Sequence, residues 1–185
     1  MEIIETKIPD LIKIQPKIFE DSRGYFFESY NQKKFEGNHL KYVFVQDNES
    51  LSSYGTIRGL HYQIAPHAQA KLVRVISGKI LDVAVDIRQN SPTFGQWEST
   101  ILSEENKTQL LIPKGFAHGF SVLSDTAIVF YKCDDFYQPD YERGINFRDE
   151  KLNIDWQINP DTAIVSPKDK VLPDFKDAEM NFSRQ

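Results

Sequence analysis

The sequence predicts an all-β protein, and among all-β folds we expect a jelly roll, in a single domain over residues 1–185. Two observations support this class. Many short segments alternate apolar and polar residues, and turn-forming residues rather than long helices separate them. Hydrophobic residues make up 40% and aromatic residues 12% of the chain, which is typical of a folded domain. A barrel of this kind encloses a pocket, so polar side chains on its inner face are candidates for a site.

The clearest strand covers residues 80–88, ILDVAVDIR, in which every second residue from Leu81 to Ile87 is apolar. A period of two predicts a strand with one buried face. A preceding strand over residues 71–76 joins it through Ser77-Gly78-Lys79, which has the composition of a hairpin turn. The same pattern predicts further strands at 97–102, 108–113, 118–123 and 126–133, with turns at 103–106, 113–115 and 123–125.

Three other segments complete the prediction. Residues 30–37, YNQKKFEG, predict one or two helical turns that end at Gly37. Residues 57–63, IRGLHYQ, have the pattern of a strand although they carry the ionisable His61. The chain after Asp149 is richer in proline and polar residues, so we expect loops and short helices packed at this C-terminal end.

Composition excludes several classes of protein. A net charge of −5, from 22 Lys and Arg against 27 Asp and Glu, argues against a nucleic-acid partner, although a few local cations can still hold a small anion. The single cysteine, Cys133, forms no disulfide within the chain and lies in an apolar run, which favours a buried thiol and a cytoplasmic protein. We expect no signal peptide and no membrane partner, because no apolar run approaches the roughly 18–20 residues that span a bilayer.

Motifs for several chemistries are missing from the sequence. It contains no G-x-S-x-G elbow and no Gly-rich phosphate loop, and no pair of carboxylates stands out. Position 63, two residues after His61, is glutamine rather than a second histidine, so we expect no metal. Proton transfer remains, with His61 as base, Tyr131 as acid, Lys71 as an oxyanion partner and one of many aspartates to orient the base. Composition does not select this set, and a single strand histidine is more often structural.

Seven stretches taken together indicate a family more specifically than any single residue does. They are residues 19–31, 46–50, 57–63, 66–97, 112–120, 131–145 and 166–169. In this order, across about residues 3–172, they closely resemble the dTDP-4-dehydrorhamnose 3,5-epimerases. The resemblance implies a cupin-type jelly-roll barrel, no cofactor, and a homodimer whose subunits exchange an N-terminal segment. It also implies the substrate dTDP-4-dehydro-6-deoxy-glucose, which is converted to dTDP-4-dehydro-rhamnose in dTDP-L-rhamnose biosynthesis.

The resemblance also assigns roles to single residues. His61 matches the general base, Asp169 the carboxylate that orients it, Tyr131 the general acid, and Lys71 the cation near the 4-keto oxygen. The matched substrate-binding positions are Arg23, Glu28, Gln46, Asp47 and Asn48 for the nucleotide, Arg58 and Lys168 for phosphate, Tyr137 for stacking on thymine, and His118 and Glu142.

These residue types suit the chemistry. The protons at carbons 3 and 5 are acidic because both carbons flank the 4-keto group, and a nearby cation stabilises the resulting enolate. Inversion needs a base and an acid on opposite faces. We also expect Gly59 to leave room for the substrate or a neighbouring chain.

Other functions remain open at this point. A 3-only or 5-only epimerase could retain the same catalytic residues. A 3,4-ketoisomerase, a non-catalytic nucleotide-sugar binding module and a metal-dependent cupin oxygenase are further alternatives.

Overall fold

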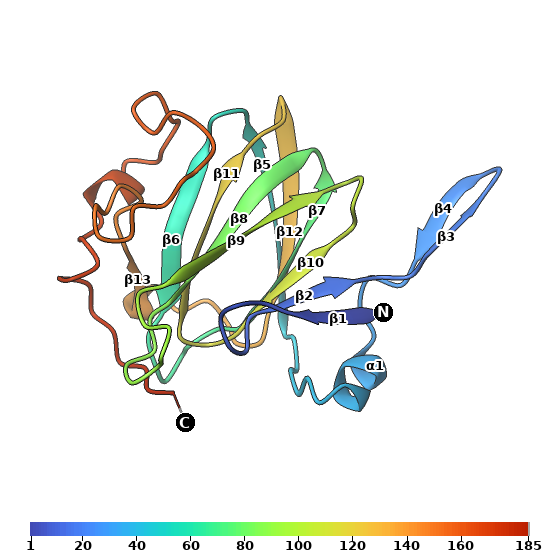
Figure 1. Ribbon diagram of the computed structural model, residues 1–185, viewed down its shortest axis with the longest axis horizontal. Helices are drawn as coiled ribbons and strands as arrows, with labels where there is room; N and C mark the ends of the chain where they lie inside the picture. Colours follow the sequence, from blue (N-terminus) through green and yellow to red (C-terminus); the bar gives the residue numbers. More distant parts are fainter. Residues whose placement is uncertain (185) are drawn as a thin grey trace.

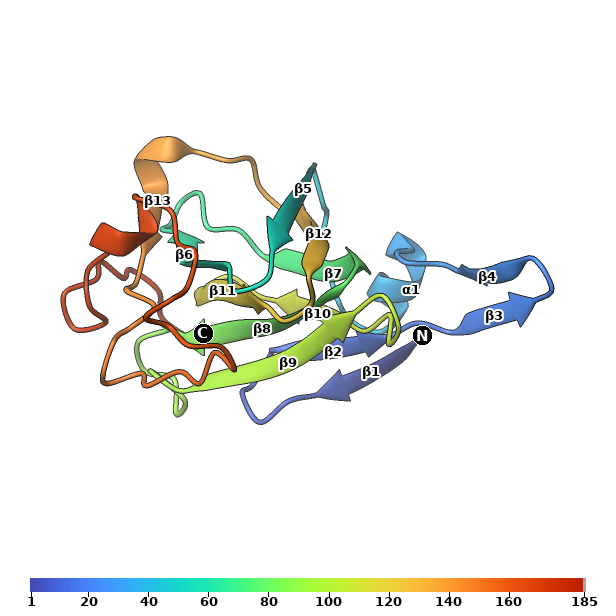
Figure 2. The same cartoon turned by 90° about the horizontal axis from the view of Figure 1, so that it is seen from above.

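The computed structural model describes residues 1–184, and its body consists of two β-sheets that face each other (Figures 1 and 2). The six-stranded sheet has the order β1 (Glu2–Glu5), β2 (Ile12–Gln15), β10 (Gln109–Ile112), β7 (Lys71–Ser77), β12 (Thr126–Cys133) and β5 (Gln46–Ser53). The five-stranded sheet has the order β13 (Glu142–Gly144), β6 (Ile57–Gln63), β11 (Phe116–Val122), β8 (Lys79–Asp86) and β9 (Trp97–Ser103). This arrangement confirms the predicted all-β class and the strands expected between residues 57 and 133.

One hydrophobic core lies between the two sheets. Val73 and Val129 of the six-stranded sheet pack with Ile80, Leu102 and Phe120 of the five-stranded sheet, and all five are buried. The alternation of side chains along each strand puts these residues on the inner faces. The same inner faces therefore carry the polar residues that line the space not filled by this core.

The helical segments are short. The helix α1 (Gln32–Gly37) begins after Asn31, whose side chain accepts a hydrogen bond from the Lys34 backbone N–H, and it confirms the helical turns predicted over residues 30–37. Two 3-10 turns follow much later, η1 (Pro139–Tyr141) and η2 (Asp169–Val171). Within residues 1–184, no helix has both the length and the apolar character needed to cross a membrane.

The prediction of one buried face for residues 80–88 is wrong. Asp82 and Asp86 on the supposedly exposed face are both 0% exposed. The reason is that β8 lies inside its sheet, with the second sheet on one face and the C-terminal segment on the other. Partners satisfy the buried carboxylates: His118 pairs with Asp82, and Arg88 donates to Asp86.

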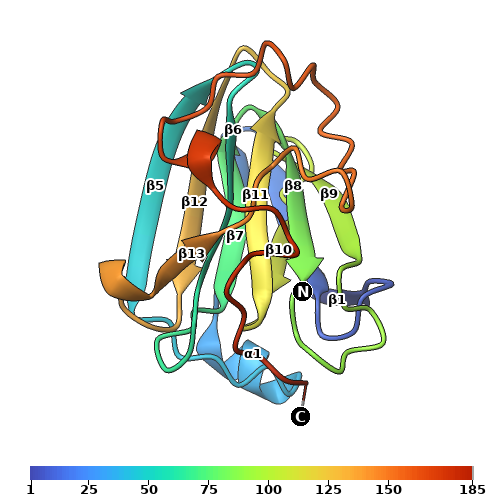
Figure 3. The ribbon, with the colours of Figure 1, turned by 90° about the vertical axis from the view of Figure 1, so that its left-hand side faces the viewer.

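The C-terminal segment covers the outer face of the five-stranded sheet (Figure 3). Phe147, Trp156, Phe175 and Phe182 are buried there against strands β6, β8 and β11. The loops and short turns expected after Asp149 are thus confirmed as a packed layer. This layer brings η2 against the middle of β6, where Asp169 meets Gly59 and His61.

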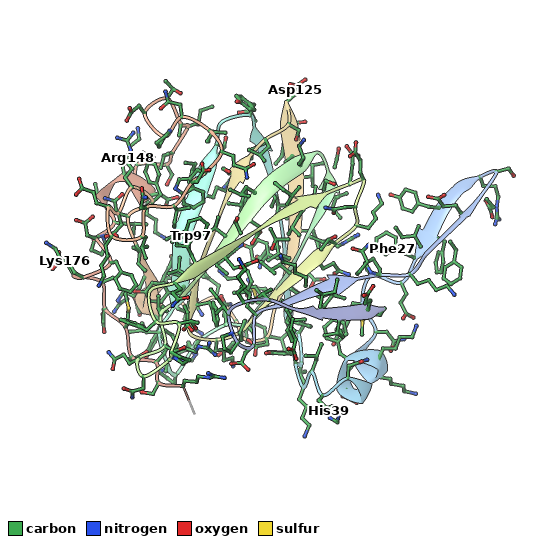
Figure 4. The ribbon with its side chains drawn as sticks, viewed as in Figure 1. Phe27, His39, Trp97, Asp125, Arg148 and Lys176 are labelled. Carbon is green, nitrogen blue, oxygen red and sulfur yellow. The ribbon has the colours of Figure 1, made fainter. Side chains whose placement is uncertain are left out.

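A separate hairpin projects from the body. Strands β3 (Ile18–Asp21) and β4 (Gly24–Phe27) pair only with each other among the described strands, and Figure 1 shows them extending away from both sheets. Figure 4 shows Phe27 where the hairpin leaves the body, and there Arg74 lies 5.6 Å from the ring centroids of both Phe27 and Phe130. Further out, Phe26 is 70% exposed and lies on the same hairpin as the exposed Phe19 and Tyr25, so the hairpin carries a group of exposed aromatic residues.

Candidate active site

A histidine–aspartate pair joins β6 to the C-terminal layer. His61 Nε2 lies 2.8 Å from Asp169 Oδ1, and the Gly59 N–H donates to the other carboxylate oxygen at 3.2 Å. Burial raises the pKa of Asp169, but the hydrogen bonds from His61 and Gly59 outweigh it and hold that pKa below its usual range. An ionised carboxylate only accepts, so His61 carries its proton on Nε2 and keeps a free lone pair on Nδ1.

Gly59 makes this geometry possible in a way that differs from the expectation. A Cβ on Gly59 would lie 2.6 Å from Gly119 Cα and 2.7 Å from the His118 carbonyl oxygen. Its φ of +117° is also one that other residues rarely adopt. The absent side chain therefore makes room for the backbone of β11 in the same chain, rather than for a substrate or a second chain.

Lys71 and Tyr131 face His61 from the other sheet. Lys71 begins β7 and Tyr131 lies on the neighbouring β12, with the Lys71 Nζ 6.0 Å from the Tyr131 ring centroid. Burial lowers the pKa of Lys71 and raises the pKa of Tyr131, because it disfavours the charged form of each group. Tyr131 thus stays protonated as a potential acid, and Lys71 is a cation in a poorly solvated place.

Two adjoining cavities share His61, Lys71 and Tyr131. The larger cavity has a volume of about 560 Å³ and also includes Arg58, His118 and Asp169 in its lining. The smaller cavity, of about 190 Å³, is lined at its other end by Gln46, Asn48, Tyr137 and Glu142. Together they have the size and the mixture of polar and apolar groups typical of a small-molecule site.

Further predicted binding residues are held in fixed positions around the cavities. His118 Nε2 lies 3.0 Å from both carboxylate oxygens of Asp82, and the Arg58 Nε donates to Ser52 Oγ at 2.9 Å. Arg58 remains exposed enough for a guanidinium that binds an anion.

The smaller cavity has its own network. Tyr137 donates its hydroxyl proton to Glu142, and Lys168 forms an ion pair with the same carboxylate. Hydrogen bonding to Glu142 raises the pKa of Tyr137 to about 12. The Tyr137 backbone N–H also donates to Gln46 Oε1 at 2.9 Å, which fixes the aromatic ring near the mouth. The Tyr137 side chain is 48% exposed and leaves a ring face open for stacking.

Three predicted residues lie outside both cavities. Asp47 is on the outer face of β5 and forms an ion pair with Lys132 at 2.9 Å. Arg23, at the tip of the hairpin, pairs with Asp21 at 2.6 Å. Glu28, just after the hairpin, pairs with Lys34 at 2.7 Å. Their binding roles stay predictions, and the site around His61 in this chain does not include them.

Cys133 is buried and accepts a hydrogen bond from Asn48, as expected for a packed thiol. Burial raises its pKa to about 11, so it is a poor nucleophile near neutral pH. Within residues 1–184, no three His, Cys, Asp or Glu side chains gather as metal ligands would.

The sequence reasoning missed Asp82, Ser50 and Ser52. Asp82 carries a signal in hindsight, because it interrupts the apolar residues of a central strand. Ser50 and Ser52 lie on β5, whose alternation of exposed and enclosed positions is carried almost entirely by polar residues. An apolar–polar pattern cannot reveal such a strand.

Comparisons with known proteins agree with this geometry. The family model described as dTDP-4-dehydrorhamnose 3,5-epimerase matches residues 5–177. This chain belongs to that family. Membership in the dTDP-4-dehydrorhamnose 3,5-epimerase family makes the chain an isomerase.

Two relatives illustrate the similarity to this epimerase family. The chain is 53% identical over 181 residues to the dTDP-4-dehydrorhamnose 3,5-epimerase of Shigella flexneri, covering 97% of this chain and 98% of the relative. A Legionella pneumophila epimerase, solved in complex with dTDP-4-keto-L-rhamnose, is 48% identical with a TM-score of 0.95, covering 100% and 98% of the two chains. This match confirms the cupin-type jelly roll.

A more distant structure is also similar. The 3'-monoepimerase ChmJ of Streptomyces bikiniensis, in complex with dTDP-quinovose, is 32% identical with a TM-score of 0.84, covering 91% of this chain and 85% of that one. The same fold therefore occurs in an enzyme described as acting at one carbon.

Proposed function

We propose that this chain inverts carbons 3 and 5 of dTDP-4-dehydro-6-deoxy-glucose and yields dTDP-4-dehydro-rhamnose for dTDP-L-rhamnose biosynthesis. The observation that carries the proposal is the placement of His61 on one sheet and Tyr131 on the facing sheet, with both side chains lining one cavity. A sugar ring held between the sheets would present one face to the base and the other to the acid. That is the requirement for inversion through loss and return of a proton.

Each inversion follows the same steps. His61 Nδ1 removes the proton next to the 4-keto group, and the electron pair of the broken C–H bond moves to the keto oxygen as an enolate. Lys71 stabilises this oxyanion, and its effect is large because the site is poorly solvated. The Tyr131 hydroxyl then donates its proton to the opposite face of the carbon. Transfer of a proton from His61 to the Tyr131 phenolate through solvent restores both groups, so no cofactor is needed.

The nucleotide would pass from Arg58 to Lys168 and then to Tyr137, because the ion pair between Lys168 and Glu142 joins the larger cavity to the smaller one. Arg58 and Lys168 suit the diphosphate, because guanidinium and ammonium groups donate to phosphate oxygens. Tyr137 at the smaller cavity suits stacking on thymine.

We further propose a homodimer in which the β3–β4 hairpin reaches the site of the partner subunit. The separation of Arg23 and Glu28 from their own cavities supports this arrangement. A cytoplasmic location is part of the proposal, and the lone cysteine supports it.

The second candidate is an epimerase that acts at one carbon only. The similarity to the 3'-monoepimerase favours keeping it, since that enzyme shares the fold. A binding module without catalysis is less consistent with a half-buried histidine held by a buried carboxylate, opposite a protonated tyrosine.

Proton NMR of dTDP-4-dehydro-6-deoxy-glucose in heavy water tests the proposal. We expect the wild-type protein to introduce deuterium at carbons 3 and 5 and to form the rhamno-configured product. His61→Asn should lower exchange at both carbons by about 100-fold or more, because the base is gone. Tyr131→Phe should retain exchange, but inversion at one or both carbons should fall by about 100-fold.

Two matched variants control for general damage. His39→Asn alters an exposed histidine whose φ of +64° asparagine accepts readily, and Tyr54→Phe removes the hydroxyl of a tyrosine that is 58% exposed. Both should behave as wild type. Deuterium at one carbon only would identify a monofunctional epimerase, and no exchange at all would contradict the proposed reaction.

A further inference from the structure

The inner face of β5 carries four polar side chains at every second position: Gln46, Asn48, Ser50 and Ser52. β5 is the edge strand of the six-stranded sheet and pairs with β12. Gln46 and Asn48 line the smaller cavity, and Ser50 and Ser52 line the larger one. This row of polar side chains, which we call the β5 row, therefore follows the length of the site from one cavity to the other.

Protein partners account for three members of the β5 row. Gln46 donates to Asn48 at 3.1 Å, Asn48 donates to Cys133, and Ser52 accepts from Arg58. Ser50 differs, because its Oγ is buried and has no hydrogen-bond partner among residues 1–184.

An unpaired buried hydroxyl is costly and uncommon in a native protein. Two other buried polar atoms in the described part of the chain share this condition, Arg74 Nε and Thr100 Oγ1. Of the three residues, Ser50 is the one that lines a cavity containing His61. A ligand in that cavity is thus a natural partner for its hydroxyl.

The position of Ser50 along the strand narrows the choice of partner. Asn48 pairs across the sheet with Tyr131, and Ser52 holds Arg58, so Ser50 lies midway between the proposed acid and the proposed phosphate contact. Each step of two residues is about 7 Å. In a pyranose, carbon 2 likewise lies between carbon 1, which bears the diphosphate, and the reacting side of carbons 3 to 5.

We propose that Ser50 is a substrate-binding residue whose hydroxyl hydrogen bonds the carbon-2 hydroxyl of the sugar. This inference rests on the proposed function and adds a specificity determinant to it. Ser50 acts as a contact that the substrate and the transition state share, and it takes no part in proton transfer. It selects hexose rings that keep a hydroxyl at carbon 2.

The test compares wild type and Ser50→Ala on two substrates, dTDP-4-dehydro-6-deoxy-glucose and its analogue without the carbon-2 hydroxyl. Ser50→Ala should raise KM for the full substrate by about 3- to 10-fold with little change in kcat, the size expected for one neutral hydrogen bond shared by both states. The KM of wild type should be higher by a similar factor on the analogue than on the full substrate. The KM of Ser50→Ala should be the same on both substrates, because removing the serine hydroxyl and removing the carbon-2 hydroxyl abolish the same contact. Binding of dTDP, which has no hexose, should be unchanged in the variant.

Ser99→Ala is the matched control, since it makes the same change on strand β9 in a residue that lines neither cavity. It should match wild type on both substrates. Equal KM values for wild type and Ser50→Ala on the full substrate would overturn the assignment. So would independent effects, in which the variant loses as much as wild type when the carbon-2 hydroxyl is removed. In either case, turnover by wild type would leave the proposed function standing. Wild-type protein with no deuterium exchange would instead refute the proposed function on which the assignment depends.

Discussion

Burial has opposite consequences for two neighbouring side chains in this site. It lowers the pKa of Lys71 and raises the pKa of Tyr131, since one is charged when protonated and the other when deprotonated. The two groups share a cavity, so the same desolvated environment keeps Tyr131 protonated and makes the Lys71 ammonium more acidic. As pH rises, Lys71 therefore loses its proton at a lower pH than an exposed lysine would, and Tyr131 keeps its proton to a higher pH than an exposed tyrosine would.

The alkaline side of the pH–rate profile should report Lys71. The ammonium is present below its pKa and lost above it, and because that pKa lies below the ordinary value, kcat should fall at a lower pH than an exposed lysine would give. Lys71→Arg keeps a charge that does not titrate in this range, so its remaining activity should persist to higher pH. The measurement is kcat from pH 6 to pH 11 for both proteins.

Circular dichroism at each pH gives the control, because it separates loss of charge from unfolding. An alkaline fall at the same pH in Lys71→Arg and wild type would assign that fall to another group.

At the scale of elements, strands β6 and β11 approach too closely at one point for any side chain to lie between them. A Cβ on Gly59 would meet the backbone of Gly119 and His118. The same strand segment carries His61 and donates a backbone N–H to Asp169. Packing of the two strands and orientation of the base therefore depend on one glycine.

Gly59→Ala should lower the free energy of unfolding by more than about 1 kcal/mol, because the new methyl group meets backbone atoms and the φ of +117° is strained for alanine. Urea unfolding followed by circular dichroism measures the loss. Gly55→Ala is the control, since its φ of +78° is also positive but nothing lies within 4 Å of its added Cβ. A loss no larger in Gly59→Ala than in Gly55→Ala would show that the close approach relaxes freely.

The elements that the sequence predicted are those with at least one apolar face. Strands β7 and β12 direct valines or alanines into the core between the sheets, and β8 directs leucine and valine against the C-terminal segment, so alternation revealed them. Strand β5 was missed because its inner face is the β5 row, where the neighbour is a cavity rather than a core. The strand hardest to predict is thus one that contributes to the site.

At the scale of the whole molecule, the β3–β4 hairpin pairs with no other strand among residues 1–184. It carries exposed aromatic residues, with Phe19 at 53%, Tyr25 at 57% and Phe26 at 70%. Such a surface is typical of a protein–protein contact. In a two-fold dimer, a residue that serves the partner's site is replaced by its copy from that partner.

Mixing two inactive variants tests the exchange. Arg23→Ala and His61→Asn each damage both sites of their own dimers. In a mixed dimer with exchanged hairpins, one site receives both changes and the other receives neither. Random mixing by unfolding and refolding should therefore restore about a quarter of wild-type activity.

Mixing His61→Asn with Tyr131→Phe gives the control. Both residues belong to the site of their own chain, so every site keeps one defect and activity should stay low. A lack of recovery in the first mixture would show that Arg23 acts within its own subunit or not at all.

Local patterns could not predict how the site assembles. The choice of Asp169 as the partner of His61 came from resemblance, because 108 residues separate them and many other aspartates were available. Packing of Phe147, Trp156 and Phe175 on the outer sheet face contributes to the position of η2, and no local sequence pattern shows where these residues pack. The exposed hairpin carries no local pattern that shows what it contacts, and in the proposed dimer that contact belongs to a second chain.

Asp169 lies near the C-terminal end of the chain, so the His61–Asp169 pair forms only when the C-terminal segment has folded. Contacts between residues so far apart in sequence form after most of the loop-closing entropy has been overcome. A chain without its last residues would keep His61 on β6 but would lack the carboxylate that orients it. The oriented base is therefore complete only after the C-terminal segment has packed on the sheet.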